Sequence, residues 1–167
     1  MIVSQRRFIT KHIHLQAFGA LLLFYAAALL LTACGSEVDF DRPPEIVYGE
    51  DICERCSMII NEARYAAAYV TEDGQAHLFD DIGGMLAHVK EATGDVVVFW
   101  VHDFDNEQWL TAEEAHYVKG DHVTPMGFGI IAFAGQERAE SWAAEQGGMV
   151  MTFSDLLVAD QTGEHDH

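Results

Sequence analysis

The predicted strands and helices follow nearly the same order in the two halves of this 167-residue chain. Alternating apolar residues at 65–71 and 76–79, separated by a turn at 72–74, predict a hairpin, and a helix and an apolar strand follow it. The predicted elements of the second half are strands at 108–110, 115–118, 128–133 and 149–153 and a helix at 134–146. This order predicts an α+β fold of two duplicated ββαβ units, about 64–103 and 108–155, with antiparallel or mixed sheets.

The first unit contains the clearest local signals. Its helix is predicted to end at Gly94 and to begin at the pair Asp80-Asp81, of which at least one caps it. The continuous apolar run Val96–Val101 is typical of a strand that is buried on both faces.

The first 33 residues have the features of a lipoprotein signal peptide. The basic residues of this segment are Arg6, Arg7 and Lys11. An apolar run over 17–31 follows, and Leu31-Thr32-Ala33-Cys34 forms a cleavage site that ends in cysteine. An uncleaved anchor is the alternative, but a span needs about twenty apolar residues. We therefore predict lipidation at Cys34 and a protein anchored to a bacterial membrane, facing the periplasm or another extracytoplasmic space.

The remaining 134 residues are enough for one domain with a modest core. Residues 34–50 are acidic and contain Pro43-Pro44, so we predict an extended tether there. The domain is predicted at 51–157, and the polar residues 158–167 are predicted to be disordered.

The charge of the chain excludes one class of partner. All 27 acidic residues and only six of the nine basic residues follow the signal segment, which gives the mature chain a net charge of −21. Such a chain is repelled by nucleic acid and by anionic lipid surfaces. We therefore expect no nucleic-acid binding.

A CxxCxM motif at the start of the domain carries the most specific chemistry. Cys53, Cys56 and Met58 place three sulfur donors within six residues. Thiolate and thioether ligands select Cu(I), whereas a thioether is a weak ligand for zinc. The motif is also compatible with a thioredoxin-like dithiol, with structural zinc, and with a small disulfide beside a buried methionine.

A methionine in the second half adds to this set. Met126 lies between Pro125 and Gly127 in a predicted loop, which is not a natural position in the core, so we predict a sulfur presented to a ligand or partner. The methionines predicted to fill the core are Met85, Met149 and Met151.

Other polar residues are weaker candidates. His77 lies in the second predicted strand of the hairpin and could supply an imidazole, although an ordinary exposed histidine is the favoured interpretation. Asp80 and Asp81 are candidates for ordering a loop near the site, but helix capping explains at least one of them. His165-Asp166-His167 is better explained as a solvated tail. The sequence contains no Ser-His-Asp grouping, phosphate loop or paired catalytic carboxylate, so we do not expect an enzyme.

The motifs together resemble the NosL family of lipoproteins accessory to nitrous oxide reductase. The resemblance is carried by the segments CERCSM (53–58), HLFDDIGGML (77–86), TPMGFG (124–129) and 131–157, and it covers about residues 50–157. It implies a duplicated ββαβ architecture and Cu(I) binding, with Cys53, Cys56 and Met58 at the positions of the family's metal motif and Met126 at the position of its downstream methionine.

The resemblance also implies a role. It implies a copper chaperone that delivers Cu(I) to apo-nitrous oxide reductase or its maturation transporter. Two alternatives remain from the residues alone. One is an extracytoplasmic dithiol–disulfide oxidoreductase that uses Cys53 and Cys56, and the other is a passive membrane-tethered adaptor in which this pair forms a stabilising disulfide.

Overall fold

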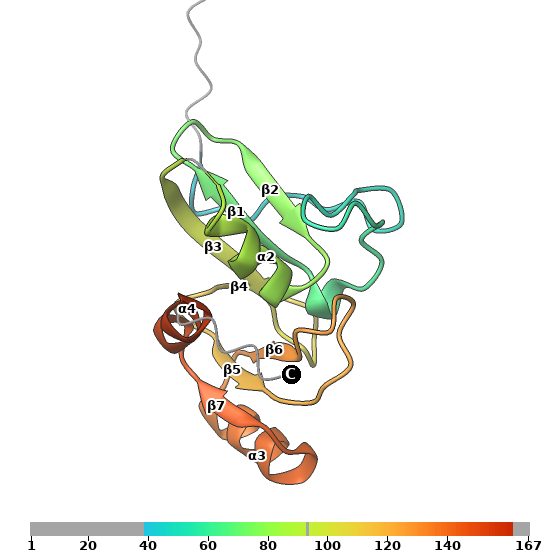
Figure 1. The fold of residues 1–167 in the computed structure, drawn as a ribbon, viewed down its shortest axis with the longest axis vertical. Coiled ribbons are helices and arrows are strands. Elements are labelled where there is room, and N and C mark those ends of the chain that lie inside the picture. Colours follow the sequence, from blue (N-terminus) through green and yellow to red (C-terminus); the bar gives the residue numbers. More distant parts are fainter. Residues whose placement is uncertain (1–38, 93, 162–167) are drawn as a thin grey trace, which may run out of the picture. The chain divides into compact units, whose positions relative to one another are not determined.

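The computed structural model describes residues 39–92 and 94–161. The predicted signal segment, Cys34 and residues 162–167 lie outside these ranges. The first sheet has the strand order β2-β1-β3-β4, and every pair in it is antiparallel (Figure 1). Its strands are β1 (Ala67–Thr71), β2 (Ala76–Phe79), β3 (Val96–His102) and β4 (Trp109–Thr111). A short 3₁₀ helix, η1 (Ala63–Tyr65), leads into β1, and α2 (Ile82–Val89) connects β2 to β3 and packs against β1 and β2.

The second sheet has the strand order β6-β5-β7 and is also antiparallel throughout. Its strands are β5 (His116–Lys119), β6 (Ile130–Phe133) and β7 (Met149–Met151). Helix α3 (Gln136–Gln146) connects β6 to β7 and packs against all three strands, and α4 (Phe153–Gln161) follows β7 (Figure 1).

The main hydrophobic core joins the two sheets. Tyr69 and Phe79 come from the first sheet, Tyr117 from the second, Met85 from α2 and Phe153 from α4, and all five are buried in one cluster. Burying a large side chain of this kind contributes about 1.5–3 kcal/mol. Because five elements of the domain share this cluster, the two sheets are expected to fold as one cooperative unit.

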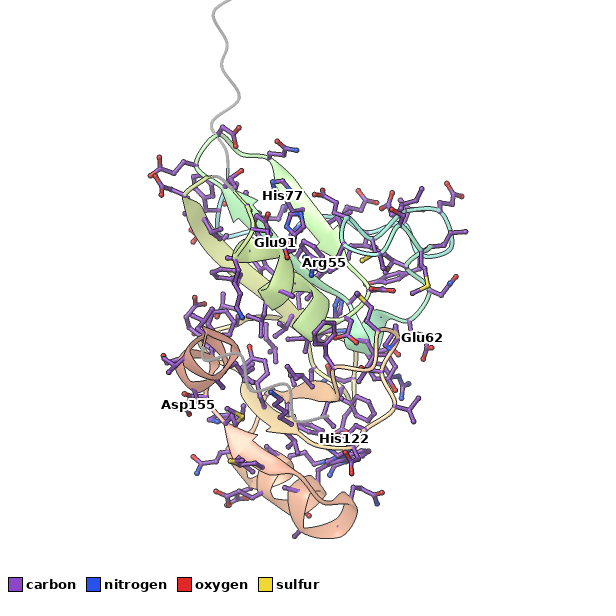
Figure 2. The ribbon with its side chains drawn as sticks, viewed as in Figure 1. Arg55, Glu62, His77, Glu91, His122 and Asp155 are labelled. Carbon is purple, nitrogen blue, oxygen red and sulfur yellow. The ribbon has the colours of Figure 1, made fainter. Side chains whose placement is uncertain are left out.

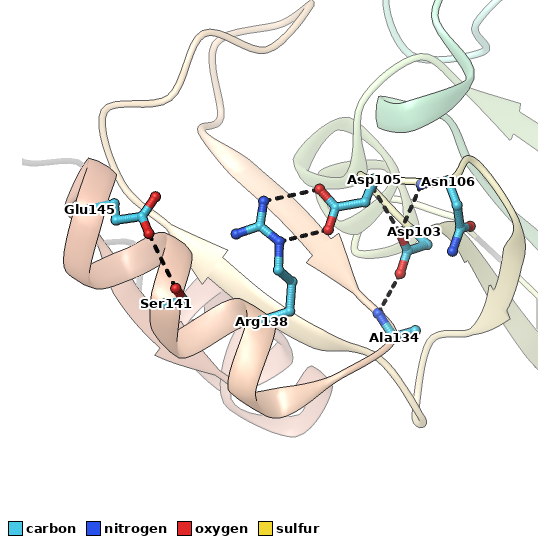
Figure 3. A network of polar contacts seen from close by, with 7 residues as sticks. All are labelled: Asp103, Asp105, Asn106, Ala134, Arg138, Ser141 and Glu145. Atoms are coloured by element: carbon cyan, nitrogen blue, oxygen red, sulfur yellow. Dashed lines mark hydrogen bonds and ion pairs between the residues drawn. The ribbon is translucent and has the colours of Figure 1, made fainter.

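A buried aspartate fastens the β3–β4 turn to the second sheet. Asp103 accepts hydrogen bonds from the backbone N–H groups of Asp105 (2.8 Å), Asn106 (3.1 Å) and Ala134 (2.7 Å) (Figure 3). Arg138 of α3 donates two hydrogen bonds to Asp105, at 2.7 and 3.0 Å. The carboxylate of Asp103 is thus satisfied by backbone donors, which explains how a charged side chain remains buried here.

The prediction of an α+β fold is confirmed. Both sheets place the first strand of a strand–strand–helix–strand group in the middle, but an internal duplication of the sequence stays a prediction. The strand predicted at 108–110 was assigned to the second unit, and this was wrong. It corresponds to β4, which pairs with β3 in the first sheet. Because β3 and β4 are close in sequence, they pair as neighbours. The apolar periodicity of a strand does not show which other strand it pairs with.

Three boundaries differ from the prediction. Residues 39–50 do not form an extended tether, because Ile46 is buried and Phe40 packs against the face of the first sheet formed by Ala68, Val70 and Trp100. Residues 158–161 are not disordered, since α4 continues to Gln161. The helix predicted to reach Gly94 ends at Val89.

Two predictions of burial were also wrong. The strand at 96–101 is not buried on both faces, since Val97 is 46% exposed. Met149, predicted to fill the core, is 65% exposed, whereas Met85 is fully buried and Met151 packs against the core. Strand β7 lies at the edge of its sheet, and this position leaves the first of its residues in solvent. In the part of the chain that the structure describes, no helix is both long and apolar enough to cross a membrane.

Candidate metal centre

The CxxCxM motif forms the tip of a narrow loop beside β2. Ile52 and Ile59 pair across this loop as an antiparallel bridge. Nearer the tip, the N–H of Cys53 donates to the carbonyl oxygen of Met58 at 2.8 Å, and the N–H of Ser57 donates to that of Cys53 at 2.8 Å. Ser57 has a φ of 62°, a left-handed conformation that is uncommon for residues other than glycine. The turn therefore curls both cysteines back toward the domain.

A further hydrogen bond attaches this tip to the first sheet. The N–H of Glu54 donates to the carbonyl oxygen of Leu78 in β2 at 3.0 Å. Two residues after Leu78, the chain reaches Asp80, immediately before α2. The end of β2 and the cysteine turn are therefore neighbours, and this arrangement brings a carboxylate to the thiols.

Cys53, Cys56 and Asp80 form a compact cluster of metal-ligating atoms. The two sulfur atoms and one carboxylate oxygen all lie within 4.8 Å of one another. The thiol of Cys56 donates to Asp80 Oδ2 at 3.5 Å. Both cysteines are free thiols, Cys53 fully buried and Cys56 half-buried. The arrangement resembles a chelating site that is entered from the side of Cys56.

The environment of Cys53 favours the neutral thiol. Burial raises the pKa of Cys53 to about 12, and the Asp80 carboxylate adds to this rise, whereas the backbone N–H groups of Asp80 and Cys56 act against it. A positive ion placed between the sulfur atoms would reverse this balance, because it stabilises the thiolate directly.

The neighbouring acids Asp80 and Asp81 have different surroundings. Asp81 caps α2, since its Oδ1 accepts the N–H of Gly83 at 2.8 Å, and its Oδ2 accepts two further hydrogen bonds. Asp80 is also buried, yet its Oδ1 has no hydrogen-bond partner. A buried carboxylate oxygen without a partner is costly, so its presence beside two thiols points to a ligand.

Met58 lies on the exposed side of the cluster. Its side chain is 46% exposed and lines an open hollow of about 500 Å³ together with Asp80 and Pro125. Glu62, labelled in Figure 2, lines the same hollow. The thioether of Met58 is therefore accessible to an incoming molecule on the side where Asp80 also lies.

The loop that carries Met126 is fastened to the start of α2. Asp81 Oδ2 accepts the hydroxyl of Thr124 at 2.6 Å and the N–H of Met126 at 3.0 Å. The sulfur of Met126 lies so close to Gly84 that a Cβ atom added there would be 2.7 Å from it. Gly84 thus permits the thioether to approach the first turn of α2.

The structure accordingly brings three of the predicted residues together with one more. Cys53 and Cys56 share a cluster with Asp80, and Met58 lines the hollow that Asp80 also lines. Met126 is attached through its backbone to Asp81, the residue next to Asp80. Whether the two thioethers act as ligands stays a prediction.

The remaining candidates are placed elsewhere. His77 lies outside this cluster, and its Nδ1 pairs with Glu54 at 2.7 Å while its ring stacks on Tyr69 at 4.4 Å (Figure 2). His165 and His167 lie outside the described residues. The importance of Asp80 was underestimated from the sequence. The signal was the doubled aspartate, because only one residue can occupy the N-cap position of a helix.

The site combines soft sulfur ligands with a hard carboxylate ligand. Two thiols can chelate one ion, a thioether stands at its exposed rim, and a carboxylate can accept a thiol proton or bind a metal. Such a set favours a soft monovalent ion when the sulfur atoms dominate.

Comparison with known proteins agrees with the resemblance found in the sequence. The copper-binding lipoprotein NosL of Stutzerimonas stutzeri is 26% identical over 167 residues, and the match covers 87% of this chain and 88% of that protein. The crystal structure of the copper chaperone NosL from Shewanella denitrificans has the same fold, with a TM-score of 0.61 at 21% identity over 68% of this chain and 94% of that chain. The NosL family itself matches residues 44–159. Since this match spans more than half of the sequence, the chain belongs to the NosL family.

Proposed function

We propose that this protein is a membrane-tethered, extracytoplasmic Cu(I) chaperone. The observation that carries the proposal is the cluster of Cys53, Cys56 and Asp80, in which two free thiols and a carboxylate lie within 4.8 Å of one another. The related protein from Stutzerimonas stutzeri is named a copper-binding lipoprotein and that from Shewanella denitrificans a copper chaperone, which supports copper as the cargo.

The sulfur donors provide retention. Cys53 and Cys56 chelate the ion from two positions of one turn, and Met58 or Met126 supplies a weaker third donor. A thioether is a good ligand for Cu(I) and a weak one for Zn(II), so this set favours copper over zinc. The buried position of Cys53 excludes water from one side of the ion.

The exposed side provides release. Met58 is 46% exposed and Cys56 is half-buried, so an acceptor thiolate or imidazole can enter the coordination sphere there. The weaker thioether then leaves before either thiolate does. Asp80 accepts a hydrogen bond from the thiol of Cys56, so it can take up that proton when the ion binds and return it to the thiolate when the ion departs.

The client and the anchor complete the proposal. The family relationship supports nitrous oxide reductase, or the transporter that matures it, as the recipient of the copper. Cys34 follows a lipoprotein cleavage site, so we propose that a lipid on this residue holds the domain at an extracytoplasmic membrane surface.

Competition for the metal tests this function. The reduced full-length chain, kept free of oxygen, is titrated with a chromogenic Cu(I) chelator and separately with a Zn(II) chelator. We expect one Cu(I) per chain, bound far more tightly than Zn(II). Equal affinity for the two metals, or no retention of copper, would contradict the chaperone function.

The two free thiols also fit a dithiol–disulfide oxidoreductase, but that role has less support. An attacking cysteine is usually activated by a lowered pKa at a helix N-terminus, whereas burial raises the pKa of Cys53 and the motif lies in a turn. Thiol oxidation of a model peptide at a catalytic rate would favour the oxidoreductase instead.

A further inference from the structure

Exposed apolar side chains are concentrated around the cysteine turn. Of the ten large apolar side chains that are exposed in the described residues, five lie between positions 47 and 59. Ile52 is 58% exposed, Met58 46% and Ile59 49%. The antiparallel bridge between Ile52 and Ile59 places these two side by side. We call Ile52, Met58 and Ile59 the apolar rim.

The side chains of the apolar rim add little to the packing of the domain. Each side chain of the apolar rim would contribute to stability if it were buried, yet all three remain in solvent, and Met58 and Ile59 line the hollow near Asp80. Scattered single apolar residues on a surface are ordinary, but adjacent ones at the mouth of a site mark an interaction surface.

The surroundings of the apolar rim are acidic. Residues 43–62 contain five acidic residues and one basic residue. Glu50 and Glu54 are exposed next to the rim in sequence, and Glu62 is exposed and lines the hollow together with Met58 and Ile59.

The single cation of this segment is already neutralised. Arg55 forms an ion pair at 2.7 Å with Glu91, which follows the end of α2 (Figure 2). The negative charge around the apolar rim is therefore not compensated by Arg55. An acidic surface around an apolar centre is complementary to a basic surface around an apolar centre.

We propose that the apolar rim and its acidic border form a docking surface for a protein whose metal-accepting site is surrounded by apolar and basic residues. This inference rests on the proposed function, since it names the kind of partner that takes the ion. Opposite charge steers the partner to the surface, and the apolar contact holds it while ligands exchange.

The negative charge of this surface favours a basic protein over two other occupants, a second copy of the chain and an anionic lipid surface. A second copy of the chain would bring the same acidic border against itself, and a like-charged contact is unfavourable. An anionic lipid surface is repelled for the same reason. A basic protein partner is the occupant that the charge of this surface attracts.

The test measures metal transfer to defined acceptor peptides. The full-length chain is held in zwitterionic lipid nanodiscs and loaded with Cu(I). Four synthetic peptides carry the same Cys-x-x-Cys acceptor, flanked by Leu and Lys, by Leu and Glu, by Ser and Lys, or by Ser and Glu. We expect the Leu–Lys peptide to take the ion about tenfold faster than the Ser–Glu peptide at low salt, with the difference shrinking as salt is added.

Two variants separate docking from binding of the metal. The double substitution Ile52→Ser with Ile59→Ser should slow transfer to the Leu–Lys peptide down to the rate of the Ser–Lys peptide. The double substitution Glu50→Gln with Glu62→Gln should remove the preference for Lys over Glu. Val158→Ser, at a 61% exposed position of α4, is the matched control and should change neither rate.

The affinity for Cu(I), measured by chelator competition, should be the same in all of these proteins. If the protein retains copper but transfers it to all four peptides at the same rate, the docking surface is contradicted and the chaperone function stands. If no copper is retained, the chaperone function itself fails. The chain could instead self-associate or bind neutral vesicles, show no preference among the peptides, and lose this association with the Ile52 and Ile59 substitutions. That result would assign the apolar rim to another occupant and overturn the proposal.

Discussion

The hydroxyl of Thr124 donates to Oδ2 of Asp81 at 2.6 Å, across 43 residues of sequence. The same oxygen accepts the N–H of Met126 at 3.0 Å. A single fully buried carboxylate thus caps α2 and also fixes the loop of the second sheet that carries the candidate thioether. Its neighbour Asp80 faces the thiols instead, so substitutions of these two acids should differ in their effect on stability.

Asp81→Ala should destabilise the domain strongly. The substitution removes a helix cap and the acceptor of two further hydrogen bonds, and it leaves three donors without partners, two of them buried, so we expect a loss of about 3 kcal/mol in the free energy of unfolding. Asp80→Asn is the matched control and should lower this free energy by less than about 1 kcal/mol, because one oxygen of Asp80 has no partner to lose. Urea unfolding followed by circular dichroism measures both. Equal losses would show that the two acids share one structural role.

Cys56→Ser should abolish the retention of copper and leave the fold intact. Cys56 is half-buried and makes no disulfide in the folded domain, so a hydroxyl can replace its thiol with little effect on packing. The measurement is copper content after gel filtration under anaerobic conditions, together with the far-ultraviolet circular dichroism spectrum. A collapsed spectrum would instead assign the cysteine pair to the stability of the domain.

Met126→Leu should speed the loss of copper while changing stability by less than about 1.5 kcal/mol, because the two side chains have similar volumes. The effect should be smaller than that of losing a thiol, since a thioether is the weaker donor. Met151→Leu is the control, because Met151 packs against the core from β7. Chelator-driven release rates compare the variants. Identical rates for Met126→Leu and the unaltered protein would remove Met126 from the site.

The stability of the domain should fall between neutral pH and pH 5, in part through His102. This side chain is 3% exposed, its Nδ1 bonds the carbonyl oxygen of Ala66 at 3.1 Å, and its Nε2 bonds the hydroxyl of Tyr48 at 3.1 Å. Burial lowers the pKa of His102, and the bond to Ala66 and the charge of Glu107 oppose this only in part. The contribution of His102 is therefore complete above the unfolded pKa of about 6.5 and is lost as the pH falls toward its lower pKa in the folded state.

The comparison with His102→Gln isolates this contribution. Glutamine keeps a polar side chain but does not titrate, so the free energy of unfolding of the variant should depend less steeply on pH between 7.5 and 5. Urea unfolding at several pH values gives the slope for each protein. Parallel slopes would exclude His102 as a source of the pH dependence.

Local patterns predicted the central parts of the fold well. The hairpin at 65–79, the helix after Asp81 and the strand at 130–133 all depend on neighbouring residues, and such signals are present in one segment of sequence. The pairing of β4 with β3 and the exposed position of Met149 depend on which strands lie at a sheet edge. The position of a strand in its sheet depends on contacts between distant segments, so local sequence patterns do not predict it.

The candidate site shows the same limit. The CxxCxM motif indicated the sulfur donors because their chemistry is local. The contribution of Asp80 depends on the hydrogen bond between Glu54 and Leu78, which places the end of β2 against the cysteine turn. The positions of Asp80 and Asp81 in sequence showed that one of them was not needed as a cap, but not that this residue would face the thiols.

The long sequence separation between Asp81 and Met126, 45 residues, has a consequence for the order in which the protein is made. A chain that emerges from its N-terminus exposes Cys53 and Cys56 well before the loop at 124–129 exists to pack beside α2. During this interval the thiols belong to an incomplete domain whose shared core is still missing its C-terminal members Tyr117 and Phe153. The cysteines are therefore most vulnerable to oxidation or to capture of the wrong metal while the chain is being made, before the domain is complete.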